Sequence, residues 1–380
     1  MAESTPTITV PKGLEHVVLG ETSISLVAGQ TGGLVYRGYA IDEIVPNATY
    51  EEVVHLLLRG VAPTREEGRE LTRELARRRA LPPGLERVVD ALPTRLPPLD
   101  AMRTLLSALG EGDFPYPPTE AQGLELIAKT PTLLARYVRR ARGHRPVAPR
   151  PELGHAANYL YMLEGSPPSG PRARALEQYL ILLADHGMNA STFALRTVLS
   201  TNSDLVSAAT AALGALKGPA HGGAPSRVVD MLDAIGAPER APGWIASALA
   251  RHERLFGFGH RAYKVEDPRA VLLKRIARDV AAPSRLQLAE AVEAEALRAL
   301  EREKPGRRLY TNVEFYGAVV LEAVGLTRDL FTPTFAVGRT AGWAAHALEQ
   351  ASDNRLIRPD IRYTGTPAGR TWPPNAPEAR

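Results

Sequence analysis

The stretch Leu216-Lys-Gly-Pro-Ala-His-Gly-Gly-Ala-Pro225 joins two predicted helices and presents one histidine between them. The first helix ends at Gly218-Pro219, because proline lacks an amide proton and restricts the residue before it. Two glycines follow His221 and leave room for a ligand beside the main chain. Pro225 suits the first turn of the next helix, over residues 226–235. Taken by itself, a lone histidine such as His221 is more often a capping or core residue than a functional one.

Helical spacing of apolar residues dominates the chain from Thr49 onward. A helix begins after Thr64, and the other predicted helices cover residues 50–59, 99–109, 119–141, 154–163, 172–185, 190–199, 207–216, 226–235, 242–255, 268–280, 286–302, 311–324 and 331–350. Before Thr49, alternation over residues 23–27, a Gly-rich turn at 29–33 and residues 34–36 predict a small β-hairpin. The predicted fold class is therefore all-α and multi-helical, with a small N-terminal β-hairpin.

Glycine-rich joints suggest a division into two domains. We expect a large helical domain formed by residues 1–221 and 331–380, and a small helical domain formed by residues 222–330. Length alone is consistent with more than one domain, since the chain has 380 residues.

Composition excludes several classes of protein. The hydrophobic share of 44% and the charged share of 23% are ordinary for a globular protein, and no apolar run approaches the ~18 residues of a membrane span. The N-terminus lacks the basic start and apolar segment of a signal peptide, so we expect a cytoplasmic location and no membrane partner. The absence of cysteine excludes disulfides, thiolate nucleophiles and Cys-ligated metals. The chain has 46 basic and 42 acidic residues, too small an excess of positive charge to indicate a nucleic-acid partner. This charge is compatible with the binding of anionic small molecules.

Three further motifs place chemically useful side chains beside flexible or apolar residues. They are Ala184-Asp-His-Gly-Met-Asn-Ala-Ser191, Gly257-Phe-Gly-His-Arg-Ala-Tyr-Lys-Val-Glu-Asp-Pro-Arg269 and Tyr310-Thr-Asn-Val-Glu-Phe-Tyr316. In the last, apolar and aromatic neighbours should desolvate Glu314 and raise its pKa toward that of a useful base. Each motif alone is weak, because Asp185 is also compatible with an ordinary cap and Glu314 with an ordinary first-turn acid.

Together, in this order, the four motifs resemble those of the citrate synthase family. The resemblance extends to residues 22–41, 155–162, 335–343 and 355–363, and spans about residues 13 to 365. The size resembles the shorter, dimeric bacterial type, and nothing corresponds to the extra N-terminal region of the larger bacterial enzymes that respond to NADH.

The resemblance implies a role for each matching residue. His221, His260 and Glu314 would be catalytic, and oxaloacetate would be bound by a set of cationic and imidazole side chains: His186, His260, Arg269, Arg339 and, from the partner subunit of a homodimer, Arg358. Arginine suits this task because its planar fork pairs with a carboxylate through two hydrogen bonds. Lys264, Lys304 and Arg307 would contact the CoA phosphates. No metal and no cofactor are implied, since acetyl-CoA is a substrate.

The implied reaction joins oxaloacetate, acetyl-CoA and water to give citrate and CoA. Glu314 would remove a methyl proton while His221 donates a hydrogen bond to the thioester oxygen, and His260 would polarise the ketone that the enol attacks. The family usually has aspartate where this chain has Glu314, so the carboxylate lies one methylene further from the backbone. A misplacement of ~1 Å can lower a rate roughly a hundredfold.

Three alternatives remain open. Synthesis of 2-methylcitrate from propionyl-CoA differs by one methyl group, which a pocket discriminates by only ~1–3 kcal/mol. A metallohydrolase with His186, His221, His260 and Glu314 as ligands is disfavoured, because no histidine pair has the close helical spacing of zinc sites. A non-catalytic paralogue that binds an acyl-CoA or a dicarboxylate is compatible with the changed base.

Overall fold

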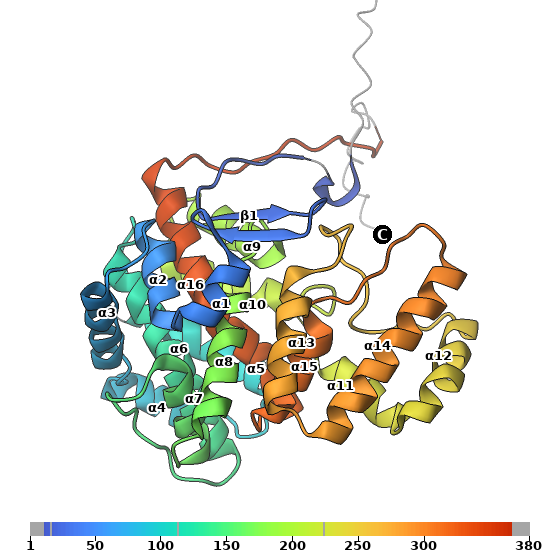
Figure 1. The fold of residues 1–380 in the computed structure, drawn as a ribbon. Coiled ribbons are helices and arrows are strands. Elements are labelled where there is room, and N and C mark those ends of the chain that lie inside the picture. The colour runs from blue at the N-terminus through green and yellow to red at the C-terminus, as the bar shows by residue number, and fades with distance from the viewer. Residues whose placement is uncertain (1–10, 16, 112–113, 223–224, 367–380) are drawn as a thin grey trace, which may run out of the picture.

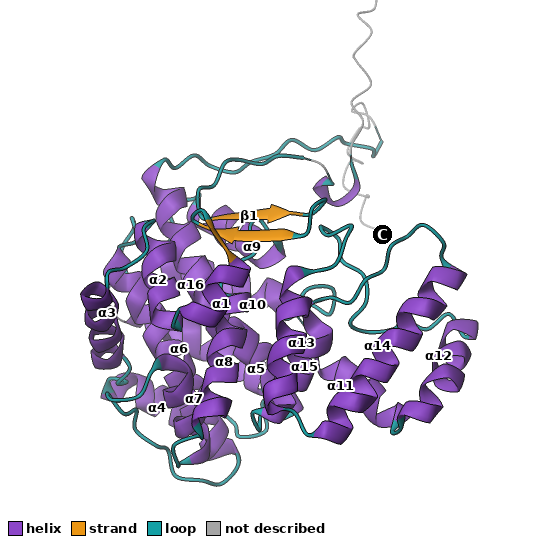
Figure 2. Ribbon diagram, in the orientation of Figure 1, coloured by secondary structure: helices purple, strands orange, loops and turns teal. Residues whose placement is uncertain are grey.

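The computed structural model describes residues 11–15, 17–111, 114–222 and 225–366. Helices form the body, and a small antiparallel sheet lies at one end of it (Figure 2). The predicted all-α class with an N-terminal hairpin is confirmed. Two glycines follow His221 in the sequence, and the second of them, Gly223, lies outside the described residues.

The sheet consists of β1 (Ser25–Ala28), β2 (Gly33–Tyr36) and β3 (Tyr39–Ala40), in that order and antiparallel throughout. Arg37 and Gly38 join β2 to β3 with φ angles of 47° and 93°, and two such left-handed residues are typical of a tight hairpin turn. Strand β3 was not predicted, because two residues are too few to show alternation.

In the part of the chain that the structure describes, ten α-helices precede His221. They are α1 (Ile41–Asn47), α2 (Tyr50–Arg59), α3 (Arg65–Arg78), α4 (Pro83–Ala91), α5 (Pro98–Ala108), α6 (Glu120–Ala141), α7 (His155–Glu164), α8 (Gly170–Leu183), α9 (Ala190–Leu199) and α10 (Leu205–Leu216). The side chains of Thr49, Thr64 and Thr119 cap α2, α3 and α6 by accepting a hydrogen bond from the third residue of each helix. These local caps explain why the starts of the three helices could be predicted closely.

Among the described residues after His221, six α-helices follow: α11 (Pro225–Ile235), α12 (Ala241–Ala250), α13 (Pro268–Val280), α14 (Pro283–Glu303), α15 (Val313–Ala323) and α16 (Phe331–Ser352). Single-turn 3-10 helices cover Lys12–Leu14 (η1), Leu109–Glu111 (η2), Pro238–Arg240 (η3) and Arg328–Leu330 (η4).

Two helices end at least two residues before their predicted ends. The helix predicted over residues 172–185 ends at Leu183, because the carboxylate of Asp185 accepts a hydrogen bond from the N–H of Gly187, at 3.0 Å, and turns the chain. The helix predicted over residues 242–255 ends at Ala250. His252 has a φ of 57°, a left-handed angle that an α-helix cannot contain.

Helix α16 forms the centre of the body, where it packs against α6, α8 and α9. Its residues are almost all buried from Phe331 to Ala347. Small residues allow α8 to approach closely: a Cβ at Gly342 would lie 2.3 Å from the carbonyl oxygen of Ala184. This contact brings the end of α8, and the loop that follows it, against the face of α16 that carries Arg339.

A second group of helices, α11, α12 and α14, lies on one side of the molecule, at the right in Figure 1. Helices α13 and α15 pack against each other and against α8, and so lie between this group and the body around α16. The loop between α12 and α13 and the loop between α14 and α15 both lead into the region beside α8, where the predicted site residues gather.

Candidate active site

The loop after α8 delivers His186 to the site and is fixed by Asp185, which is fully buried. The N–H of Asp185 donates to the Tyr36 hydroxyl at 3.2 Å, and this hydroxyl donates to the carbonyl of Asp185 at 2.9 Å. Burial alone would raise the pKa of Asp185, but His346, Arg339 and other neighbours hold it at about 2. The carboxylate therefore stays ionised and holds the loop in place.

His221 lies in the turn between α10 and α11, close to the N-terminus of α9. The backbone N–H of Ser191 donates to Nε2 of His221 at 3.3 Å, and the Ser191 hydroxyl lies 2.9 Å from the same nitrogen. Since a backbone N–H can only donate, Nε2 carries no proton in the neutral ring, and the proton is on Nδ1. Burial, with a smaller effect of Arg339, lowers the pKa of His221 to about 4, so the ring is neutral near pH 7.

His260 has the opposite tautomer. The N–H groups of Ala262 and Tyr263 donate to Nδ1 of His260, at 3.0 Å and 3.1 Å, which leaves the proton on Nε2. Burial and then Arg269 lower the pKa of His260 to about 4. Nε2 of His260 lies 3.3 Å from Nη2 of Arg269, so two N–H donors face the same space.

The chain before His260 pairs with the chain before Glu314. Gly257 accepts from the N–H of Asn312 at 2.9 Å, and Gly259 donates to the carbonyl of Tyr310 at 2.7 Å. Gly257 and Gly259 have φ angles of 86° and 82°, which only glycine adopts without strain. The pairing fixes the position of the His260 loop relative to the first turn of α15.

Glu314 lies in that first turn, where the Asn312 side chain caps the helix by accepting from the N–H of Glu314 at 3.0 Å. Burial raises the pKa of Glu314 to about 7, although Arg254 and Arg269 act in the opposite direction. The direction of the shift predicted from its apolar neighbours is confirmed. A carboxyl group with this pKa can accept a proton near neutral pH and release it again.

Two buried arginines lie beside the histidines. Arg269 is paired with Asp267 at 2.8 Å, and both side chains are almost inaccessible to solvent. Arg339, on α16, donates from Nε to the carbonyl of Leu183 at 2.6 Å, while its Nη1 is buried without a hydrogen-bond partner among the described residues. Burial lowers the pKa of Arg339 to about 10, which still leaves it cationic at pH 7. A buried guanidinium with a vacant donor is suited to bind a carboxylate.

Comparisons with known proteins show the family to which the chain belongs. The family model described as citrate synthase, C-terminal domain, matches residues 13–360. The chain belongs to the citrate synthase family. The citrate synthase of Haloferax volcanii is 43% identical over 366 aligned residues, covering 93% of this chain and 95% of the relative. The 2-methylcitrate synthase 2 of Corynebacterium glutamicum is 38% identical over 372 aligned residues, covering 95% and 96% of the two chains.

A solved citrate synthase has the same fold. The structure of a ternary complex of carboxymethyl coenzyme A and oxaloacetate with citrate synthase from Thermoplasma acidophilum matches with a TM-score of 0.88. The two chains are 29% identical, and the match covers 97% of this chain and 99% of that one.

Direct contacts link the residues predicted from the citrate synthase motifs in two sets, and Arg339 is close enough to both sets to lower the pKa of His186 and of His221. The structure brings together His186, His260 and Arg269: the rings of His186 and His260 have centroids 5.4 Å apart, and Arg269 lies beside His260. His221 and Arg339 lie near Phe335, with the His221 ring centroid 6.3 Å from that of Phe335 and the guanidinium of Arg339 4.9 Å from it.

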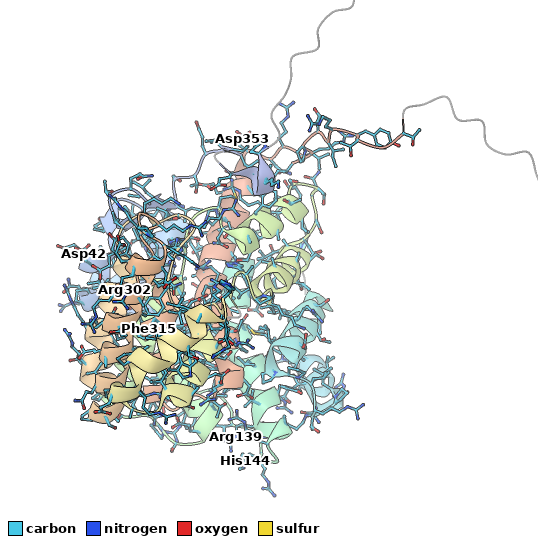
Figure 3. The ribbon with its side chains drawn as sticks, turned by 90° about the vertical axis from the view of Figure 1, so that its right-hand side faces the viewer. Asp42, Arg139, His144, Arg302, Phe315 and Asp353 are labelled. Atoms are coloured by element: carbon cyan, nitrogen blue, oxygen red, sulfur yellow. The ribbon has the colours of Figure 1, made fainter. Side chains whose placement is uncertain are left out.

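Arg358 is not brought to this site by its own chain. It lies on the segment that follows α16, and Figure 3 shows the chain after Asp353 running away from the helical body. Its side chain is 77% exposed, and its recorded ionic partner is Asp360, at 3.7 Å. Lys264, Lys304 and Arg307 are also exposed.

Sequence reasoning missed three residues that shape the site. Ser191 sets the tautomer of His221, Asp267 pairs with Arg269, and Tyr263 contacts both His186 and His260. All three lie inside the motifs at residues 184–191 and 257–269, and this position was the one sequence signal that could have identified them.

No group of three or more His, Cys, Asp and Glu side chains within the described parts of the chain is arranged to hold a metal ion. In the same parts, no helix combines the length and the apolar composition needed to cross a membrane.

Proposed function

We propose that this chain condenses oxaloacetate with acetyl-CoA and water to give citrate and CoA. The observation that carries the proposal is the hydrogen bond from the Ser191 N–H to Nε2 of His221, because it leaves the proton of a neutral ring on Nδ1. A neutral histidine that presents N–H is the donor needed to stabilise the enolate of a thioester.

The first step removes a proton from the methyl group of acetyl-CoA. Glu314 takes this proton, since a carboxyl group with a pKa of about 7 is ionised in part at neutral pH. Negative charge moves onto the thioester oxygen, which accepts a hydrogen bond from Nδ1–H of His221.

The second step forms the carbon–carbon bond. The enolate carbon attacks the ketone carbon of oxaloacetate, and the ketone oxygen takes up the proton of Nε2–H of His260. The His260 ring is reprotonated as Glu314 releases the proton that it took in the first step. Arg269, Arg339 and His186 bind the carboxylates of oxaloacetate. Water then hydrolyses the citryl thioester, and citrate and the CoA thiol leave.

A second candidate function uses propionyl-CoA in place of acetyl-CoA and gives 2-methylcitrate. Similarity to the Corynebacterium glutamicum protein named 2-methylcitrate synthase favours a test of propionyl-CoA. We propose to measure thiol release from acetyl-CoA and propionyl-CoA, each with and without oxaloacetate. Release that requires oxaloacetate supports condensation, and the ratio of kcat/KM values identifies the preferred acyl group. No release with either thioester would support the non-catalytic alternative.

CoA binding is proposed for three exposed cations, Lys264, Lys304 and Arg307. If they contact the phosphates, replacing Lys304 by glutamate should raise the KM for acetyl-CoA and leave the KM for oxaloacetate unchanged.

No cofactor is expected, and a cytoplasmic location stays a prediction.

We propose a homodimer in which Arg358 completes the site of the partner subunit. Large apolar side chains on the same segment support this, since Leu356, Ile361 and Tyr363 are 55%, 93% and 75% exposed and would be covered by a second copy. Mixing Arg358→Ala subunits with His221→Ala subunits should restore part of the activity, because one site of each hybrid would be intact. A mixture as inactive as its parents, with subunit exchange demonstrated, would contradict a shared site.

The small domain of residues 222–330 is proposed to close over oxaloacetate before acetyl-CoA binds. The glycines beside His221 and His260 in the sequence support hinges at these places, and closure would exclude water from the enolate. Small-angle scattering should show a smaller radius of gyration when oxaloacetate is present, and equal radii would argue for a rigid site.

A further inference from the structure

Tyr263 lies between two histidines of the site and is 2% exposed. Its ring centroid is 5.5 Å from that of His186 and 4.9 Å from that of His260. Its hydroxyl oxygen is 3.2 Å from Nε2 of His186 and 3.4 Å from the carbonyl oxygen of Gly33, at the start of β2. The steps of the proposed reaction leave this side chain without a role.

The N-terminal hairpin holds Tyr263 in this position. The N–H of Lys264 donates to the carbonyl of Gly29 at 2.8 Å, and a Cβ at Gly29 would lie 2.3 Å from the carbonyl oxygen of Ala262. The turn between β1 and β2 is thus pressed against the residues on both sides of Tyr263. On β1, the hydroxyl of Ser25 accepts from the N–H of Gly187 at 3.1 Å, so the same hairpin also fixes the His186 loop.

The chemistry of His186 makes the Tyr263 hydroxyl important. Burial and then Arg269 hold the pKa of His186 well below its usual value, so the ring is neutral and has one N–H. A carboxylate can only accept hydrogen bonds, so His186 can bind oxaloacetate only if its N–H points to the ligand. Nε2 of His186 contacts the Tyr263 hydroxyl, whereas Nδ1 forms no hydrogen bond with any described residue.

We propose that Tyr263 is a positioning residue: its hydroxyl donates to Nε2 of His186 and holds the proton of that ring on Nδ1, where it can donate to a carboxylate of oxaloacetate. The competing acceptor, Gly33, lies further from the hydroxyl oxygen, at 3.4 Å against 3.2 Å. The inference rests on the proposed function, since it names oxaloacetate as the ligand.

Kinetics of Tyr263→Phe provide the first test. This variant keeps the ring contacts and removes only the hydroxyl, so the KM for oxaloacetate should rise about twofold to tenfold, the effect of one neutral hydrogen bond, while kcat stays nearly constant. Tyr137→Phe, on α6, is the matched control: it removes a tyrosine hydroxyl that donates to the carbonyls of Pro93 and Leu96 and touches no predicted site residue. An unchanged KM for oxaloacetate, or a fall in kcat alone, would overturn the proposal.

The tautomer can be observed directly by NMR of protein with 15N-labelled histidine, in which His186→Gln identifies the signals of His186. With oxaloacetate bound, wild-type His186 should be protonated on Nδ1, and Tyr263→Phe should show a mixture of both tautomers. Protonation on Nε2 in the wild type would overturn the proposal. This measurement needs no turnover, so it separates failure of the inference from failure of the proposed reaction, which the thiol-release assay tests.

Gly29→Ala tests the contact between the hairpin and the Tyr263 loop. It also provides a second test of the proposal if Tyr263→Phe fails to fold. The added methyl group meets the backbone of Ala262 and must displace the loop that carries Tyr263, so the KM for oxaloacetate should rise at least as much as in Tyr263→Phe. Gly20→Ala is the control, because nothing lies within 4 Å of its added Cβ. Equal KM values in the two alanine variants would contradict the role of the hairpin.

Discussion

Replacing Glu314 by glutamine should stabilise the protein at pH 8 and abolish its reaction. Burial raises the pKa of this carboxyl from 4.5 to about 7. Because the folded chain then binds the proton more tightly than the unfolded chain, the free energy of unfolding falls as the pH rises from about 4.5 to about 7. Above pH 7 the wild type is destabilised by the full amount, whereas glutamine has a similar shape and no charge.

The size of the effect follows from the shift. A pKa raised by roughly 2.5 corresponds to about 3 kcal/mol of destabilisation at pH 8, which is an upper value because Glu314 retains some exposure to solvent. The stability of Glu314→Gln relative to the wild type should therefore grow by about 2 kcal/mol between pH 5 and pH 8.

Urea unfolding followed by far-UV circular dichroism at several pH values measures this difference. Glu70→Gln is the control, since Glu70 is exposed on α3 and its replacement should produce no such trend. A stability difference between Glu314→Gln and the wild type that does not change with pH, or a variant that is less stable than the wild type at pH 8, would refute the reasoning.

Four further outcomes are expected. Glu314→Asp should lower kcat by ~10–100-fold, because the carboxylate recedes by one methylene; an equal or higher kcat would mean that the site is not built for glutamate. In the wild type, kcat/KM for acetyl-CoA should fall about tenfold from pH 8 to pH 6 as Glu314 takes up a proton, and a flat profile would point to another base. Gly257→Ala should lower the Tm, because φ is 86° and the new Cβ would lie 2.8 Å from that of Phe315, whereas Gly243→Ala, in open space on α12, should not. Turnover should survive EDTA, and a complete loss that zinc restores would contradict the mechanism.

Local sequence signals were enough for much of the fold. Helix α2 was predicted with both ends correct, because the cap at Thr49 and the left-handed Gly60 after it act within one turn of each end. Helix α1 was not predicted, since seven residues with a proline among them show little helical periodicity. The end of α8 was placed two residues late, because Asp185 turns the chain at Gly187 and is held there by Tyr36, which is far away in the sequence.

The sequence motifs predicted which residues form the candidate site, but they did not predict the hydrogen bonds between those residues. The motifs identified His186, His221, His260 and Glu314, and the apolar neighbours of Glu314 gave the direction of its pKa shift. The tautomers could not be predicted, because each depends on which backbone N–H faces the ring, as with Ser191 and His221.

Carbon NMR of the reaction products tests the central claim, the formation of a carbon–carbon bond, most directly. Acetyl-CoA labelled with 13C in its methyl group is incubated with the protein and oxaloacetate. The proposed mechanism predicts that the label appears in a methylene carbon of citrate, only when oxaloacetate is present, and that Glu314→Gln yields none. Either of two other results would contradict condensation. Label that stays in acetyl-CoA would show that no reaction occurs, and label in free acetate would show that the protein only hydrolyses the thioester.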